Sequence, residues 1–175
     1  METKKIENLK NQILTSNWKV AKLAIDDLVK IGDESVIEFL IGLLDQKDAA
    51  IRNKAALALS DLKAHQAVKP LLTSIFKPEN RNYNGTMVYA LQELNCEHLL
   101  VEIFQILFYH DYEAKMGAMT ILEEQIFSFD EYDLFKIQKM WQEYNENFEK
   151  GKGFDNEALR LEIQEVYEGF MKYLK

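Results

Sequence analysis

The feature that most constrains the fold of this chain is an internal period of about thirty-one residues. Four leucines are separated by 31, 32 and 31 residues: Leu28, Leu59, Leu91 and Leu122. The same three steps connect a column of small or apolar residues: Ala24, Ala55, Met87 and Ala118. A period of this length predicts stacked structural repeats, because each repeat can bury its apolar face only against its neighbours.

Short polar residues recur with the same steps and predict where each repeat begins. This column contains Asn17, Asp48, Asn80 and Asp111. Asn and Asp are strong N-caps, because the side-chain oxygen accepts a free backbone N–H of the first helical turn. A second helix is expected after a break in each of the first three copies. Its apolar stripe is Ile37, Leu40, Ile41 and Leu44, then Val68, Leu71, Leu72 and Ile75, then Leu100, Ile103, Phe104 and Leu107. Each repeat is therefore predicted to be a helix–turn–helix unit.

These repeats predict an all-α fold, a right-handed α-α superhelix of about four helical hairpins with a C-terminal cap. The 7 Gly and 2 Pro are too few for a turn-rich β protein. We expect a single domain over residues 1–175. Its parts are a leading helix over 3–15, repeats over 17–47, 48–79, 80–110 and 111–128 plus the following helix, and a cap over 129–175. The fourth copy departs at Gln125, which stands where the other copies have Ile or Leu. Residues 77–86 form a polar loop, either functional or a frayed junction between repeats.

The segment over residues 48–72, DAAIRNKAALALSDLKAHQAVKPLL, resembles HEAT repeats, especially the short repeats of bacterial phycobilin lyases and their relatives. The matching residues are Asp48, Ile51, Arg52, Ala55, Ala56, Ala58, Leu59, Ala67, Val68 and Leu71. At the Arg52 position the other copies carry Ala21, Asn84 and Lys115. The resemblance covers roughly residues 17–128. It implies an armadillo-type superhelix and generally a protein-binding role, and it identifies no reaction, because one fold hosts many functions.

Charge and aromatic residues are concentrated in the second half of the chain. The net charge is −8, and residues 112–175 carry 14 acidic and 8 basic side chains. Of the 20 aromatic residues, 17 follow position 81. An acidic surface disfavours duplex nucleic acid and favours a basic protein partner. The alternative is that the acidic residues only keep the protein soluble.

The sequence predicts no metal site, cofactor site or catalytic constellation. Cys96 and His98 form a lone C-x-H pair, whereas a zinc site needs four ligands. The acidic clusters lack the E-x-x-H pairs of di-metal bundles. No apolar run spans a bilayer, and the N-terminus has no signal-peptide core. With one Cys, a reducing compartment is the default, so we expect a cytoplasmic protein with no membrane partner.

A partner protein is expected to bind the solvent face of the second helices, which line the concave side of such a stack. Positions opposite the apolar stripe give the candidate protein-binding residues: Phe39, Gln66, Thr73, His98, Glu102, Gln105 and Tyr109. Exposed aromatic residues beside polar ones suit protein contact. For Phe39, the alternative is packing against a neighbouring repeat.

The first functional hypothesis is a non-enzymatic module that holds a partner protein in its concave groove. Specific versions are an immunity or antitoxin role, against a basic toxin, and an adaptor role. The alternative is a lyase-like or chaperone-like subunit that grips a cofactor-bearing client protein. A third hypothesis, a HEAT-like nucleic-acid-repair enzyme, is disfavoured because the chain lacks a basic phosphate-binding face. The oligomeric state is left open.

Overall fold

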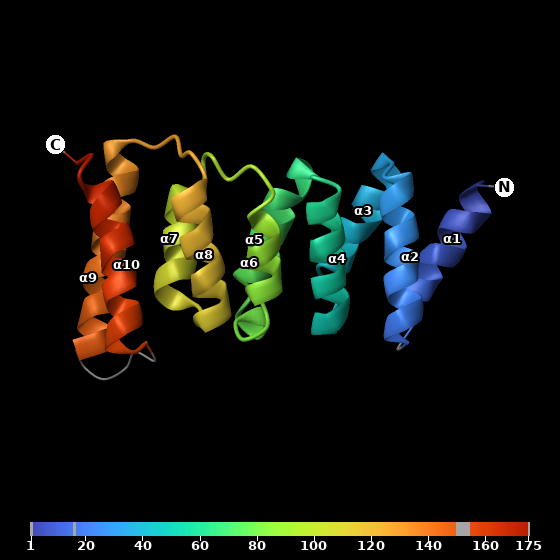
Figure 1. Ribbon diagram of the computed structural model, residues 1–175, viewed down its shortest axis with the longest axis horizontal. Coiled ribbons are helices and arrows are strands. Elements are labelled where there is room, and N and C mark those ends of the chain that lie inside the picture. Colours follow the sequence, from blue (N-terminus) through green and yellow to red (C-terminus); the bar gives the residue numbers. More distant parts are fainter. Residues whose placement is uncertain (1, 16, 150–154, 175) are drawn as a thin grey trace. The chain divides into compact units, whose positions relative to one another are not determined.

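The computed structural model describes residues 2–15, 17–149 and 155–174, and every regular element within them is a helix (Figure 1). The α-helices are α1 (Glu2–Ile13), α2 (Trp18–Ile31), α3 (Glu34–Leu43), α4 (Ala49–Asp61), α5 (Val68–Ile75), α6 (Gly85–Leu91), α7 (Leu100–Tyr109), α8 (Tyr112–Glu124), α9 (Glu131–Glu149) and α10 (Glu157–Met171). Two 3-10 helices, η1 (His65–Ala67) and η2 (Pro78–Asn80), flank α5. The predicted all-α, HEAT-like solenoid class is confirmed.

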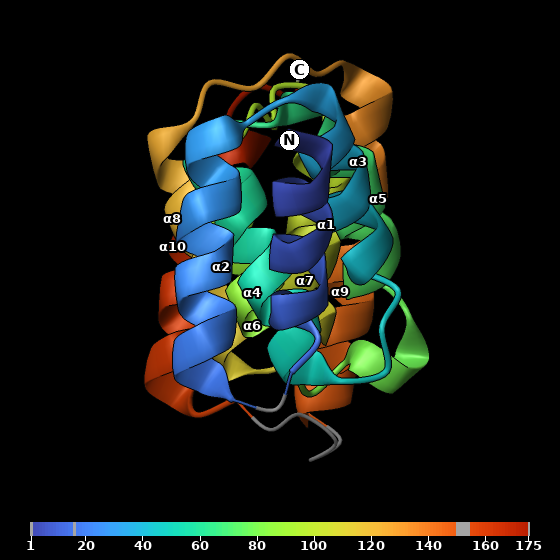
Figure 2. The same cartoon turned by 90° about the vertical axis from the view of Figure 1, so that its right-hand side faces the viewer.

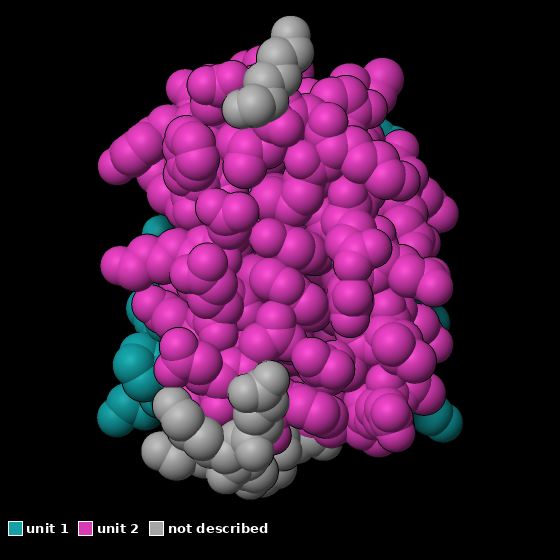
Figure 3. All heavy atoms as spheres, turned by 90° about the vertical axis from the view of Figure 1, so that its left-hand side faces the viewer, with its two compact units in different colours: residues 1–95 teal, residues 96–175 magenta. Residues whose placement is uncertain are grey.

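The chain forms two compact units, residues 1–95 (unit 1) and residues 96–175 (unit 2), which Figure 3 colours separately. The boundary falls between α6 and α7, inside the predicted third repeat. The predicted single domain and its repeat boundaries remain predictions.

Unit 1 consists of two layers of helices, with α2, α4 and α6 in one and α1, α3 and α5 in the other (Figure 2). Neighbouring helices contact across the layers, and α2, α4 and α6 also contact along their own layer. Leu28, Leu59 and Leu91 are fully buried, as the period predicts. Ala24 and Ala55 are also buried in this interior, where small side chains let α2 and α4 approach closely. These stacked helix pairs are the repeat arrangement of a HEAT-like solenoid.

Unit 2 also has two layers, α7 with α9 and α8 with α10, but its core is aromatic. Phe104 is fully buried, and its ring centroid lies 5.5 Å from that of Phe108 and 5.3 Å from that of Phe170. Trp141 of α9 stacks on Tyr167 of α10 with centroids 4.7 Å apart. Unit 2 therefore holds its helices together with large rings where unit 1 uses aliphatic and alanine packing.

Three of the four predicted N-caps are confirmed. The side chains of Asn17, Asp48 and Asp111 each accept a backbone N–H of the helix that follows. The prediction for Asn80 is wrong. Asn80 ends η2, is buried, and donates its Nδ2 to the Ser74 carbonyl at 2.8 Å and to Ser74 Oγ at 3.1 Å.

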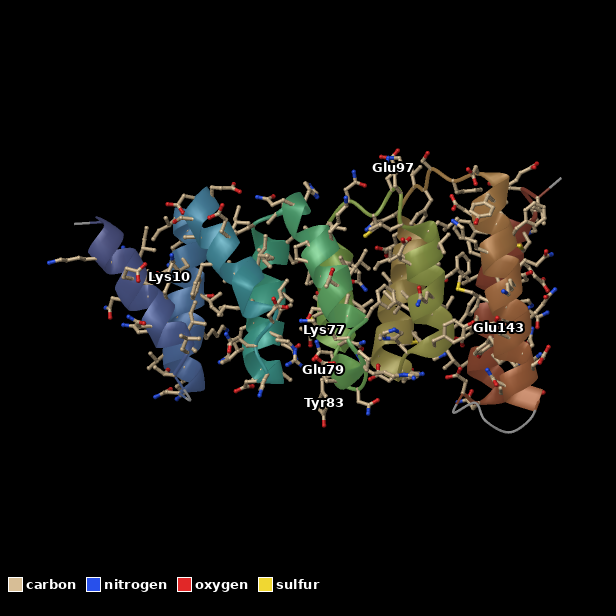
Figure 4. The ribbon with its side chains drawn as sticks, turned by 180° about the vertical axis from the view of Figure 1, so that it is seen from behind. Lys10, Lys77, Glu79, Tyr83, Glu97 and Glu143 are labelled. Atoms are coloured by element: carbon tan, nitrogen blue, oxygen red, sulfur yellow. The ribbon has the colours of Figure 1, made fainter. Side chains whose placement is uncertain are left out.

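The polar loop over residues 77–86 is held in place by buried hydrogen bonds and is not frayed. Ser74 Oγ donates to the Leu44 carbonyl at 2.8 Å, so a continuous chain of buried hydrogen bonds links Asn80, Ser74 and the end of α3. The buried amide of Asn84 donates to the Ile75 carbonyl at 3.1 Å. Because these contacts hold the loop, α6 starts late, at Gly85. The exposed side chain of Tyr83 points away from the helices (Figure 4).

The apolar stripe of α3 is rotated from the predicted one. Val36, Leu40, Leu43 and Leu44 are buried, whereas Ile37 and Ile41 are half-exposed. The leading helix α1 packs chiefly against α2, which leaves this flank of α3 partly uncovered.

The position of Arg52 has one structural role in three of the four copies. Arg52 Nη1 donates to the carbonyls of Gln46 and Lys47 at 2.7 and 2.8 Å, and Asn84 donates to that of Ile75. Lys115 Nζ donates to the carbonyls of Leu107 and Phe108 at 2.9 and 3.1 Å. The last carbonyls of a helix lack partners within the helix. The different side chains in this column therefore all donate to backbone carbonyls just before their own helix. Asn84 and Lys115 bind carbonyls at the ends of α5 and α7, and Arg52 binds carbonyls of the loop that follows α3.

Candidate partner-binding site

The predicted protein-binding residues of unit 1 are accessible to solvent, although Phe39 is half-buried and contacts Lys10. Gln66 and Thr73 are exposed, and Gln66 Nε2 lies 3.4 Å from Glu34 Oε2. Phe39 is half-buried, and Lys10 Nζ lies 5.1 Å from its ring centroid. Figure 4 shows Lys10 on α1. Phe39 thus contacts the leading helix α1, and its part in binding a partner stays a prediction.

The predicted residues of unit 2 are also accessible to different degrees. His98 and Gln105 are exposed, and Glu102 is half-exposed. The half-buried Tyr109 donates its hydroxyl to Glu143 Oε2 at 3.1 Å, on α9 (Figure 4). Burial and this carboxylate raise the pKa of Tyr109 to about 12. Tyr109 is therefore part of the contact between α7 and α9. Three of the seven predicted residues lie in unit 1 and four in unit 2, so their use as one binding face remains a prediction.

The structure reveals a pocket in unit 2 that the sequence did not predict. It has a volume of about 830 Å³ and lies between α8, α10 and the segment 125–130 that connects α8 to α9. Its lining residues are Met119, Leu122, Glu123, Gln125, Ile126, Phe127, Phe129, Glu162, Glu165, Val166, Gly169, Phe170 and Tyr173. Pockets of a few hundred to a thousand Å³ are typical of binding sites.

Two hydrogen bonds hold the connecting segment in place over the pocket. Gln125 Oε1 accepts the backbone N–H of Cys96 at 3.0 Å, and the Ser128 N–H donates to the Glu97 carbonyl at 2.8 Å. Gln125, which stands where the other copies have Ile or Leu, thus anchors this segment. Its far end is fixed by Asp130, whose carboxylate accepts the N–H of Asp133 at 3.0 Å at the start of α9.

Aromatic rings form the apolar wall of the pocket. The ring of Phe170 lies 6.0 Å from that of Phe127 and 5.9 Å from that of Phe129, and Phe129 lies 5.7 Å from Tyr173. Phe127 and Phe129 are two positions apart in an extended segment, which places both rings on one side of it. At the edge, Ile126 is 89% exposed and Tyr173 is 66% exposed. The wall therefore leaves large apolar side chains open to contact.

Helix α10 supplies one continuous face to the pocket. Its lining residues follow helical spacing: Glu162, Glu165, Val166, Gly169 and Phe170. Tyr173 extends this face just after the end of the helix. A Cβ atom at Gly169 would meet no heavy atom within 4 Å. Gly169 therefore marks open space in the pocket wall, which a larger side chain could enter without a clash at its Cβ.

Carboxylates occupy the rim of the pocket. Glu123, Glu162 and Glu165 line it. Among the described residues, none of these three side-chain carboxylates accepts a hydrogen bond or forms an ion pair. No Lys, Arg or His is among the described residues that line the pocket. The site thus combines an apolar wall with an uncompensated negative rim.

The thiol nearest to this site, that of Cys96, is held in its protonated form. Cys96 is buried, and burial raises the pKa of its thiol to about 12, which suppresses the nucleophilic thiolate. Within residues 2–15, 17–149 and 155–174, no group of three or more His, Cys, Asp or Glu side chains is placed to hold a metal ion. The geometry of the pocket suits recognition by shape, apolar contact and charge.

Sequence reasoning missed the pocket because tertiary packing brings its two sides together. Two local signals were present: the alternation of Ile126, Phe127, Ser128 and Phe129, and the mixed acidic and apolar stripe of α10. Neither signal shows that the two segments face each other across α8.

None of the helices in the described part of the chain has the length and apolar character needed to cross a membrane. Comparison with curated proteins gives no match. Residues 6–92, about half of the chain, match the family model for HEAT repeats. This match covers most of unit 1 and ends before the pocket of unit 2. Over residues 6–92, the chain therefore belongs to the HEAT-repeat family.

Proposed function

We propose that this protein is a non-enzymatic module that binds a partner protein, with the pocket of unit 2 as its principal contact. The observation that supports this most is the open aromatic wall formed by Phe129, Phe170 and Tyr173 beside the exposed Ile126. Large apolar groups open to contact and rimmed by polar ones are typical of protein-binding surfaces. In this proposal the repeats of unit 1 serve as a rigid support, and an immunity, antitoxin or adaptor role is a specific version of it.

The face predicted from the sequence is retained as a second contact. Gln66, Thr73, His98 and Gln105 have exposed side chains that a partner could reach. They offer mainly hydrogen-bonding groups, which contribute specificity more than they contribute affinity. We place the main binding energy at the pocket, because buried aromatic contacts dominate typical interfaces.

The test fills the pocket and measures partner capture. Gly169→Trp places a large ring where the glycine leaves open space. Leu161→Trp on the same helix is the control, since Leu161 is exposed and does not line the pocket. The tagged protein and both variants are used to capture partners from cells that express the native gene. We expect one protein that the wild type and Leu161→Trp retain and Gly169→Trp loses. Equal capture by all three would contradict the pocket as the contact.

A second candidate function is that of a subunit that grips a cofactor-bearing client, as the resemblance to phycobilin lyases implies. The pocket volume of about 830 Å³ is in the range that holds a small molecule. However, a linear tetrapyrrole carries carboxylates, which Glu123, Glu162 and Glu165 would repel. Incubation with bilins tests this function: a new visible absorbance band supports it, and an unchanged spectrum counts against it.

A further inference from the structure

We infer that the pocket of unit 2 accepts a basic amphipathic segment of the partner, with an apolar or aromatic side chain inserted at Gly169 and Lys or Arg side chains at the rim. This inference rests on the proposed function and specifies the chemistry of the partner.

The apolar half of the inference follows from the pocket wall. The ring centroid of Phe129 lies 5.9 Å from that of Phe170 and 5.7 Å from that of Tyr173, both in edge-on contacts. Gly169 leaves open space in the same pocket lining. Aromatic pairs prefer tilted contacts of this kind, so an inserted Trp, Phe or Leu side chain finds several partners at once. A side chain that fills such a pocket is the usual anchor of an interface.

The basic half follows from the rim. Glu162 and Glu165 lie one turn apart on α10, and Glu123 lies at the end of α8. The three carboxylates lack partners among the described residues, so a cation can approach them without breaking an existing ion pair. Unit 2 as a whole carries 17 acidic and 8 basic residues, which attracts a cationic segment and repels an anionic one at long range.

The same charges decide between possible occupants. An anionic lipid surface or a nucleic acid would be repelled by this rim. A second copy of the chain would have to present its own near-neutral unit 1 or its acidic unit 2, because residues 1–95 carry 13 basic and 12 acidic side chains. A basic segment of another protein fits the rim best.

Three labelled synthetic peptides test the inference against the full-length protein by fluorescence anisotropy. The first has Lys on its polar face and Leu and one Trp on its apolar face, the second replaces every Lys with Glu, and the third keeps Lys but replaces the apolar residues with Ala. We expect the first peptide to bind at least ten times more tightly than either of the others. Equal binding of the Lys and Glu peptides would overturn the charge argument, and equal binding of the Ala peptide would overturn the anchor argument.

Protein variants then locate the binding. Glu162→Gln with Glu165→Gln should weaken the first peptide about 3- to 10-fold and reduce its salt dependence, because each exposed ion pair contributes modestly. The matched control is Glu157→Gln with Glu168→Gln, which removes the same charge from the same helix outside the pocket lining. An equal effect of both pairs would show only general attraction and would overturn the inference, as would unchanged binding to Gly169→Trp.

The outcomes also separate this inference from the proposed function. If Gly169→Trp loses a captured partner protein while no basic peptide binds the pocket, the partner chemistry is wrong and the binding function stands. If sedimentation shows a dimer that Gly169→Trp dissociates, the occupant is a second copy and the inference is wrong.

Discussion

Unit 1 and unit 2 share a two-layered helical plan but differ in charge, core and family match. Residues 1–95 carry 13 basic and 12 acidic side chains and 5 of the 20 aromatic residues. Residues 96–175 carry 8 basic and 17 acidic side chains and 15 aromatic residues. The family match falls in unit 1, and the aromatic pocket lies in unit 2. A regular repeat thus needs little more than aliphatic packing, as in unit 1, whereas the acidic and aromatic residues of unit 2 are not dictated by the repeat.

The column of Arg52, Asn84 and Lys115 shows the same difference at one position. Arg52 of unit 1 contacts backbone carbonyls, and its side chain is buried. Lys115 of unit 2 does the same and also pairs with Asp155 at 2.8 Å, where side-chain exposures are 5% and 9%. Tyr144 donates its hydroxyl to the same Asp155 oxygen at 2.9 Å. In unit 2 this position is therefore part of a buried polar network that joins α8, α9 and the segment just before α10.

The largest expected effect comes from breaking this network. Lys115→Met should lower the free energy of unfolding by about 3–5 kcal/mol, because it leaves the Asp155 carboxylate buried without its cation. Arg52→Met in unit 1 should cost less, about 1–3 kcal/mol, because it leaves only neutral carbonyls unpaired. Urea unfolding of both variants measures the comparison. A smaller loss for Lys115→Met than for Arg52→Met would contradict it.

A truncation in the core of unit 1 tests the repeat packing. Leu59→Ala should cost about 2–5 kcal/mol, since Leu59 is fully buried among aliphatic neighbours. The exposed Leu23→Ala is the control and should change stability by less than about 0.5 kcal/mol. Hydrogen exchange should show the loss of protection first in α2, α4 and α6. Equal effects of the two substitutions would remove Leu59 from the core.

Alkaline pH should weaken unit 2. Burial raises the pKa of Tyr109 to about 12, and burial also raises the pKa of Tyr144 and of Tyr167. Because the unfolded phenols lose their protons near pH 10, the stability from these groups is full below about pH 10 and is lost as pH rises through about 12.

Urea midpoints measured between about pH 9 and pH 11 check this sign, with hydrogen exchange to separate the units. The decline with pH should be shallower in Tyr109→Phe, which has lost one of the raised groups. A steeper decline in Tyr109→Phe would show that the phenol does not contribute in this direction.

The smallest expected effect is a gain in stability when either of two helical glycines, Gly169 or Gly42, is replaced by alanine. Gly169→Ala and Gly42→Ala should each stabilise the protein by about 0.5–1 kcal/mol, because alanine favours the helix and its Cβ meets no neighbour within 4 Å. Thermal unfolding measures both. Destabilisation by Gly169→Ala alone would show that the pocket wall is closed at this position.

The period of about thirty-one residues correctly predicted buried leucines in each unit, but it predicted neither the orientation of Asn80 nor the pocket. Leu28, Leu59, Leu91 and Leu122 are all buried, because a repeated apolar face has one way to be covered. Asn80 fits the polar column, but its side chain turns inward and its NH2 group donates to the buried Ser74 carbonyl. In this orientation its side-chain oxygen does not cap a helix. The pocket depends on contacts between segments that no local pattern pairs, so it required the structure.

Hydrogen–deuterium exchange of the protein with and without its captured partner shows whether the partner occupies the pocket of unit 2. We expect new protection over residues 119–129 and 162–173, the segments that line the pocket. Protection confined to α3 and α5 of unit 1, with residues 119–129 and 162–173 unchanged, would contradict this expectation.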